Sequence, residues 1–140
     1  MRPADIEAVL RENTRMIICT AASNVTGTIM PLKEIGEIAR RNHILFLVDG
    51  SQGMGVMKID TEEYNIDLLT VSGHKSLMGP QGTGFLYVRS GTEIRPEALM
   101  RGPILNTMSL TVMSLSVSPQ TSMIASNLTA THMEVINCTA

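Results

Sequence analysis

The sequence predicts an α/β fold with a mostly parallel sheet and flanking helices. Two apolar runs, residues 15–20 and 44–49, have the length and the continuous apolar character of strands that are covered on both faces in a parallel sheet. Residues 31–42, between these runs, carry apolar side chains at helical spacing. A strand, a helix and a strand in this order imply a crossover connection, which leaves the two strands parallel.

The remaining elements follow from the same patterns. Pro3 at an early position, with Ile6 and Leu10 on one side, predicts a short helix. The second helix would bury Leu32 and Ile35 and turn its charged residues to water. In chain order we expect a helix at residues 3–11, a strand at 15–20, a loop at 21–28, a helix at 31–42 and strands at 44–49, 66–71 and 84–88.

Composition excludes several classes of partner. The net charge of -2 and the lack of a basic stretch argue against nucleic acid or an anionic membrane surface. No apolar run approaches the roughly 18 residues that a membrane-spanning helix needs. The first residues read as a polar helix and not as a signal peptide, and only two cysteines, Cys19 and Cys138, occur. We therefore expect a cytoplasmic protein with reduced cysteines.

Charge is distributed unevenly along the chain. Every charged residue except Glu134 lies between Arg2 and Arg101. Residues 103–140 are rich in serine and threonine, contain no glycine and follow neither the helical nor the strand period. We therefore expect two segments, residues 1–102 as the folded domain and residues 103–140 as an unmatched tail that is poorly ordered or packs by default, with open strand edges in the sheet.

Three groups of polar residues follow the predicted strands. Asn24 follows the first strand, Asp49 ends the second, and Ser72-Gly73-His74-Lys75 follows the third. Ligands of parallel sheets bind at the carboxyl ends of the strands, so these groups form a candidate site. An amine nucleophile, a carboxylate and a glycine-rich loop, residues 79–84, suit pyridoxal phosphate chemistry.

Each of these residues also has a simpler interpretation. Most lysines lie in solvent, but Lys75 follows a buried strand between glycines, and desolvation would lower the pKa of its amine. Asp49 would cap a turn as readily as it would bind a ligand. Gln52 is either a ligand to the phenolic oxygen of the cofactor or an exposed turn residue. His43 reads as structural, and no set of residues has the spacing of a metal site.

Three motifs together resemble the class V aminotransferase family. They are residues 24–28 (Asn-Val-Thr-Gly-Thr), residues 48–52 (Val-Asp-Gly-Ser-Gln) and residues 72–84, which begin Ser-Gly-His-Lys and end Gly-Thr-Gly. The nearest branch is the one called cysteine desulfurase-like. The resemblance implies that residues 1–102 are the central part of the large domain of a fold-type-I pyridoxal-phosphate-dependent enzyme, and that longer members of the family form homodimers.

The resemblance also implies a role for each site residue. Lys75 would be the Schiff-base lysine and would then move protons at the substrate carbon. Asp49 would pair with the pyridine nitrogen of the cofactor, Ser72 and His74 would bind its phosphate, and Gln52 would contact its phenolic oxygen. Asn24 would lie near the phenolic oxygen of the cofactor and near the carboxylate of the substrate. The substrate would be a small amino acid, and a desulfurase would convert cysteine into alanine and an enzyme-bound persulfide.

The sequence also departs from the family. Family members are longer and carry an aromatic residue that stacks on the cofactor, an arginine for the substrate carboxylate and, in desulfurases, a nucleophilic cysteine. None of these is matched here, and Cys138 lies in the unmatched tail. If residues 119–123 were encoded CCC CAG ACA AGT ATG, a shift of one base would give Pro-Asp-Lys-Tyr, which resembles a downstream stretch of the family, so a frameshift is our hypothesis for the tail.

Alternative functions therefore stay open. The chain is expected to be either an active desulfurase, transaminase or lyase of this family, or an inactive truncated remnant. A nucleotide-binding module is a third reading, weakened because residues 79–84 lack the lysine of a P-loop.

Overall fold

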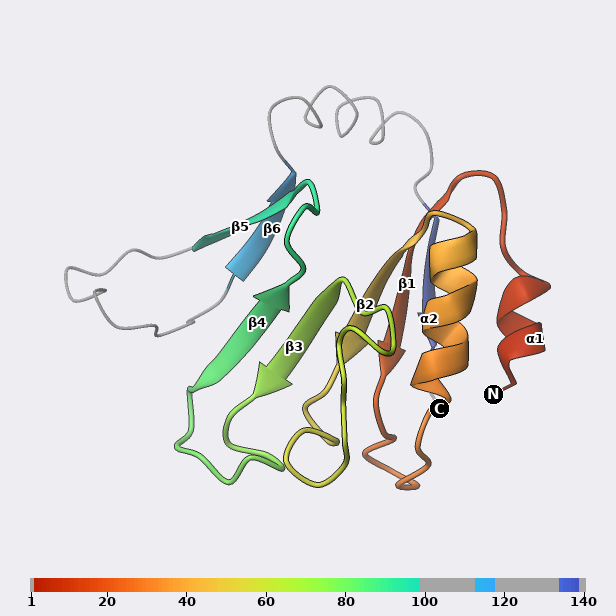
Figure 1. Ribbon diagram of the computed structural model, residues 1–140. Coiled ribbons are helices and arrows are strands. Elements are labelled where there is room, and N and C mark those ends of the chain that lie inside the picture. Colours follow the sequence, from red (N-terminus) through yellow and green to blue (C-terminus); the bar gives the residue numbers. More distant parts are fainter. Residues whose placement is uncertain (1, 99–112, 118–133, 139–140) are drawn as a thin grey trace.

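The computed structural model describes residues 2–98, 113–117 and 134–138 (Figure 1). Five strands form one sheet in the order β4-β3-β2-β1-β7, and two more, β5 and β6, form a separate antiparallel pair. The elements, in chain order, are α1 (Pro3–Glu7), β1 (Thr14–Thr20), α2 (Leu32–Arg41), β2 (Leu45–Asp49), β3 (Leu68–Ser72), β4 (Gly84–Val88), β5 (Ile94–Ala98), β6 (Met113–Val117) and β7 (Glu134–Cys138).

The predicted α/β class, with a mostly parallel sheet, is confirmed. β1 pairs in parallel with β2 and with β7, and β2 pairs in parallel with β3. Only β4 runs antiparallel to its neighbour β3 in this sheet. We expected open strand edges in the sheet, but the edge of β1 is occupied by β7, which comes from the segment 103–140 that we expected to be poorly ordered or to pack by default. The same segment supplies β6, which pairs with β5, and its other residues lie outside the described part of the chain.

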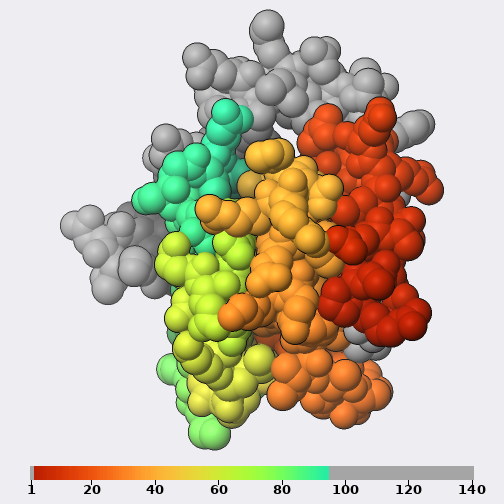
Figure 2. All heavy atoms as spheres, turned by 45° about the vertical axis from the view of Figure 1, so that its right-hand side comes forward, coloured from red at the N-terminus to blue at the C-terminus, as the bar shows by residue number. Residues whose placement is uncertain are grey.

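The core lies between the sheet and the helices. Helix α2 turns Ile35 and Ile38 inward, where they pack with Ile17 and Phe46 of the sheet, and all four side chains are buried. Its charged side chains lie on the opposite side. Arg40 and Arg41 in its last turn interact favourably with the negative end of the helix dipole. Figure 2 shows α2 lying between the N-terminal segment and the segment that precedes β3. This packing fixes the strand ends that carry the polar groups.

The two faces of the sheet differ. In the described residues both helices contribute to the same large cluster, since Ile6 of α1 also joins it. On the other face a smaller cluster forms around Leu47, Leu68 and Ile94. The expectation that β1 is fully covered on both faces is therefore only half met, because Met16 and Ile18 on this second face are only partly buried.

Two boundaries of the predicted elements differ from the sequence prediction by more than one residue. Helix α1 ends at Glu7 and not at Arg11, because only Ile6 of its residues is buried, which leaves no apolar face for a longer helix. β3 begins at Leu68, since Ile66, although buried, belongs to a turn and donates its backbone N–H to the carbonyl of Thr61 (2.9 Å).

Candidate functional site

The predicted site residues lie on three loops at one edge of the sheet. β1, β2 and β3 run in the same direction, and their carboxyl ends and the loops that follow them lie together along the lower edge in Figure 1. In the sheet register Asp49 is paired with Thr20 of β1 and with Thr70 of β3. Asp49 is therefore the last residue of a central strand, with a neighbouring strand on each side.

Asp49 is connected to β3 through Ser51. The Ser51 backbone N–H donates to Asp49 Oδ1 (2.9 Å). The Ser51 hydroxyl donates to Ser72 Oγ (3.1 Å) and accepts a hydrogen bond from the backbone N–H of Ser72 (3.1 Å). Ser51 is only 5% exposed, so these bonds are shielded from water. The carboxylate of Asp49 and the hydroxyl of Ser72 are thus both bonded to Ser51, the first through its backbone N–H and the second through its hydroxyl.

The loop after β3 is closed on itself by backbone hydrogen bonds. Gly73 donates to the carbonyl of Thr83 (2.8 Å), and Gly79 donates to the carbonyl of Gly73 (2.7 Å). A Cβ at Gly73 would overlap Thr83 Oγ1, so this approach requires glycine. The loop also contacts the loop after β2, because Ser76 Oγ donates to the carbonyl of Gln52 (2.9 Å).

The six predicted residues differ in exposure. Asp49, Gln52 and Ser72 are half-buried, whereas Asn24, His74 and Lys75 are exposed. The expectation that Lys75 is desolvated is therefore wrong for this chain, because its side chain points out of a surface loop. Among the described residues, neither His74 nor Lys75 has a side-chain hydrogen bond or ion pair, so the loop after β3 carries an unpaired amine and an unpaired imidazole.

Sequence reasoning missed Ser51 and Ser76, the two residues that link these loops. Ser51 stood inside the quoted motif, between Asp49 and Gln52, but only its burial distinguishes it from an ordinary turn serine. The apolar strand on its N-terminal side was the available signal, because a hydroxyl directly after a buried strand needs a partner.

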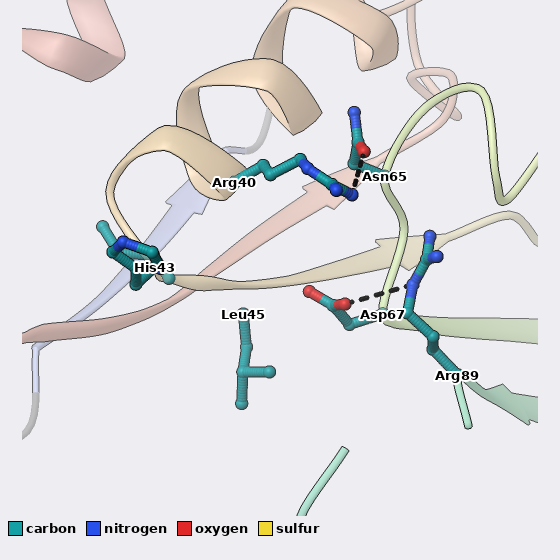
Figure 3. A pocket seen from close by; sticks show the side chains of 7 residues that line it. Arg40, His43, Leu45, Asn65, Asp67 and Arg89 are labelled. Carbon is teal, nitrogen blue, oxygen red and sulfur yellow. Dashed lines mark hydrogen bonds and ion pairs between the residues drawn. The ribbon is translucent and has the colours of Figure 1, made fainter. Parts of the chain in front are cut away.

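A cavity of about 290 Å³ opens at the opposite edge of the sheet (Figure 3). Its polar groups bond to one another: Arg40 Nη1 donates to Asn65 Oδ1 (3.0 Å), and Arg89 pairs with Asp67. None of the six predicted residues lines it. The lining residues are Arg40, His43, Ile44, Leu45, Asn65, Asp67 and Arg89.

The sequence model of the aminotransferase class-V family matches residues 1–126 of this chain. The chain belongs to that family. The matched region contains all three loops of the site and extends beyond residue 102. The boundary that we drew there between a family domain and an unmatched tail remains a prediction.

Several curated relatives of this chain are cysteine desulfurases. The cysteine desulfurase IscS of Methanosarcina thermophila is 46% identical over 94 residues, which are 67% of this chain and 23% of the relative. The mitochondrial cysteine desulfurase of Saccharomyces cerevisiae is 43% identical over 98 residues, 70% of this chain and 20% of the relative. The chain therefore spans about a fifth of the length of the curated relatives that it matches.

Solved structures of the family share the fold. A chain described as SspA in complex with cysteine superposes with a TM-score of 0.67 at 30% identity, covering 95% of this chain and 37% of that chain. The apo cysteine desulfurase of Thermococcus onnurineus gives a TM-score of 0.62 at 28% identity, covering 86% and 30%. The α/β class of this class-V chain agrees with these structures. None of its described helices is long and apolar enough to cross a bilayer.

Proposed function

We propose that the chain is part of a pyridoxal-phosphate-dependent enzyme that acts on a small amino acid, with cysteine desulfuration as its reaction. One observation carries this proposal: the Ser51–Ser72 hydrogen bond ties the loop of the Asp49 carboxylate to the loop of the free Lys75 amine. The curated relatives named as cysteine desulfurases support the reaction. The solved relative in complex with cysteine supports the substrate class.

The residues present fit pyridoxal phosphate by their chemistry. The cofactor carries an aldehyde, a pyridine nitrogen and a phosphate, which call for an amine, a carboxylate and hydrogen-bond donors. Lys75 and Asp49 supply the first two, and Ser72, His74 and the N–H groups of the glycine-rich loop supply the third. When bound, the cofactor withdraws electrons from the substrate carbon and so eases the loss of a proton there.

The chain's own residues then have the following tasks. Lys75 Nζ would hold the cofactor and would carry a proton to and from the substrate carbon. The Asp49 carboxylate would keep a proton on the pyridine nitrogen. Ser72 and His74 would bind the phosphate. Gln52 and Asn24 would orient the phenolic oxygen, and Asn24 would also orient the carboxylate of the substrate.

Two other functions are separable by experiment. A transaminase is the second candidate because the solved relatives include ureidoglycine–glyoxylate aminotransferase of Bacillus subtilis, with a TM-score of 0.59 at 28% identity. A chain without activity of its own is the third, since it spans only about a fifth of its curated relatives. Alanine from cysteine, with sulfide released when an added dithiol reduces the persulfide, would identify the desulfurase, and a keto acid product would identify the transaminase.

We propose a homodimer for the complete enzyme. Large apolar side chains are exposed on the loops around the site, among them Val25 (82%), Val56 (66%) and Met78 (87%). Exposed apolar groups of this kind mark surfaces that another chain covers. Sedimentation of the full-length protein would measure its mass, and a monomer would contradict the proposal. A cytoplasmic location also remains a prediction, because several curated relatives are named as mitochondrial enzymes.

The test of the cofactor site is borohydride trapping on the purified chain. Pyridoxal phosphate is titrated in, the visible absorbance is followed, and the reduced adduct is located by peptide mass mapping. We expect saturable labelling at Lys75 that is lost in Lys75→Ala and unchanged in Lys33→Ala, which removes a surface lysine paired with Glu63. Equal labelling of Lys33, Lys58 and Lys75, or no labelling, would contradict the proposal.

A further inference from the structure

Two serine hydroxyls cross-link the loops that carry the two halves of the site. One half consists of Asp49, the last residue of β2, and Gln52 in the loop after it, and the other half, with Lys75, lies at the end of β3 and in the loop that follows. The last register pair between these strands joins Asp49 to Thr70. The last backbone bond on this edge runs from the Gly50 N–H to the Thr70 carbonyl (2.9 Å). Beyond it, the sheet no longer holds the two loops together.

Ser51 makes the first cross-link. Its hydroxyl donates to Ser72 Oγ and accepts from the Ser72 N–H, both at 3.1 Å, while its own N–H donates to Asp49 Oδ1. A hydroxyl has one hydrogen to donate, and this one is directed to Ser72 Oγ. Because only 5% of the surface of Ser51 is exposed, water has little access to these hydrogen bonds.

Ser76 makes the second cross-link, on the far side of Lys75. Its hydroxyl donates to the backbone carbonyl of Gln52 (2.9 Å). The loop after β2 also approaches this segment closely at Gly55, where an added Cβ would lie 3.2 Å from Leu77 Cδ2 and 3.3 Å from the Ser76 carbonyl. Lys75 is therefore flanked by two tethers that both end on the Asp49–Gln52 loop.

We infer that Ser51 and Ser76 are positioning residues, which fix the loop of Lys75 relative to the loop of Asp49. Neither hydroxyl is assigned a contact with substrate or cofactor. They act by fixing the distance between the loop of Lys75 and the loop of Asp49. Without these hydrogen bonds an exposed loop would vary that distance. The consequence for cofactor binding rests on the function proposed above, whereas the cross-link itself does not.

Hydrogen exchange of the chain without cofactor tests the cross-link. We expect the Ser72 amide to be protected, and Ser51→Ala to reduce that protection about tenfold by removing its acceptor. Ser51→Thr, which keeps the hydroxyl, should restore protection. Thr14→Val is the matched control, because it removes a buried hydroxyl that accepts from the Arg11 N–H at the opposite end of the sheet. Unprotected Ser72 in the unaltered chain would overturn the inference.

Borohydride trapping tests the consequence. Ser51→Ala and Ser76→Ala should each weaken saturable labelling of Lys75 several-fold, while Thr14→Val leaves it unchanged at a similar loss of thermal stability. Labelling as tight as in the unaltered chain would overturn the positioning role. If Ser51→Ala does not fold, Ser51→Cys, which keeps the side-chain size, and Ser76→Ala take its place. If the unaltered chain is not labelled at Lys75, the proposed function fails, and the exchange result alone decides whether the cross-link stands.

Discussion

Arg89 and Asp67 are joined twice, once through their side chains and once through the backbone. Arg89 Nε lies 3.3 Å from Asp67 Oδ1, and the Arg89 N–H donates to the Asp67 carbonyl (2.8 Å). The second carboxylate oxygen of Asp67 accepts from the Phe46 N–H (2.9 Å). Only 21% of each charged side chain is exposed. The pair therefore connects the start of β3 to both neighbouring strands at the edge opposite the candidate site.

Replacing Arg89 by alanine should lower the free energy of unfolding by about 2 kcal/mol, because charge-assisted bonds are lost and Asp67 stays half-buried without its ion pair. Arg89 also donates to the carbonyls of Ile66 (3.1 Å) and Thr61 (2.7 Å). Urea unfolding followed by circular dichroism measures the change. Arg40→Ala, which removes a single exposed contact, should cost below about 1 kcal/mol. Equal losses in the two variants would contradict this role.

Gly36 is expected to be irreplaceable in α2. An added Cβ would overlap the carbonyl oxygen of Tyr64 and lie 3.4 Å from Phe46 Cδ1. Gly36→Ala should therefore destabilise the chain by about 1–3 kcal/mol, although alanine favours a helix by itself. Glu37→Ala, at the next, exposed position, is the control and should change stability little. Thermal unfolding of both variants measures the effect, and a stabilised Gly36→Ala would show that the helix can shift.

The Glu63 carboxylate should make stability depend on pH at the acid side. Hydrogen bonds from Lys58 and Lys33 and their charges lower the pKa of Glu63 below its ordinary value of 4.5. A lowered folded-state pKa gives stability that is present above 4.5 and lost as the pH falls through the folded value.

Glu63→Gln should therefore lower the unfolding temperature slightly near neutral pH and leave it unchanged in acid. Because these groups are exposed, the difference should also shrink in high salt. Glu34→Gln is the control, since its exposed side chain has no hydrogen bond or ion pair among the described residues. A difference that persists undiminished in acid would refute the assignment.

Asp49→Asn should weaken pyridoxal phosphate binding by about tenfold or more, because a charge-assisted bond to the cofactor becomes a neutral one. The amide oxygen can still accept from the Ser51 N–H, so stability without the cofactor should stay within about 0.5 kcal/mol. An absorbance titration measures the affinity. An unchanged affinity at unchanged stability would remove Asp49 from the site.

Elements with a strong buried face were predictable from sequence. The strand at Leu45–Asp49 and the helix at Leu32–Arg41 match their predicted ranges to within one residue at each end, since burial imposes a clear pattern on each. The start of β3 was wrong because Ile66, buried in a turn, looks the same in sequence as a buried strand residue. β7 had no such pattern, and its pairing with β1 depends on residues far away in the chain.

The sequence could predict at which edge of the sheet the site residues lie, but not the hydrogen bonds that connect them. Residues after parallel strands had to meet at one edge, so Asp49 and Ser72 could be grouped from topology alone. The exposure of Lys75 could not, because it depends on what covers the loop and not on the strand before it. The cross-links of Ser51 and Ser76 depend on loop conformation, which short polar sequences do not specify.

The pairing of β1 with β7 also bears on how the sheet assembles. A single helical crossover separates β1 from β2 in the sequence. β7, the other neighbour of β1, is far away in the sequence, and it pairs Glu134 with Thr14. Because bringing distant segments together costs loop entropy before any bond is gained, the β2 side of β1 should form early and the β7 side last. During that interval β1 exposes an unpaired edge, so the slowest step of folding is also the step at which one chain can pair with another.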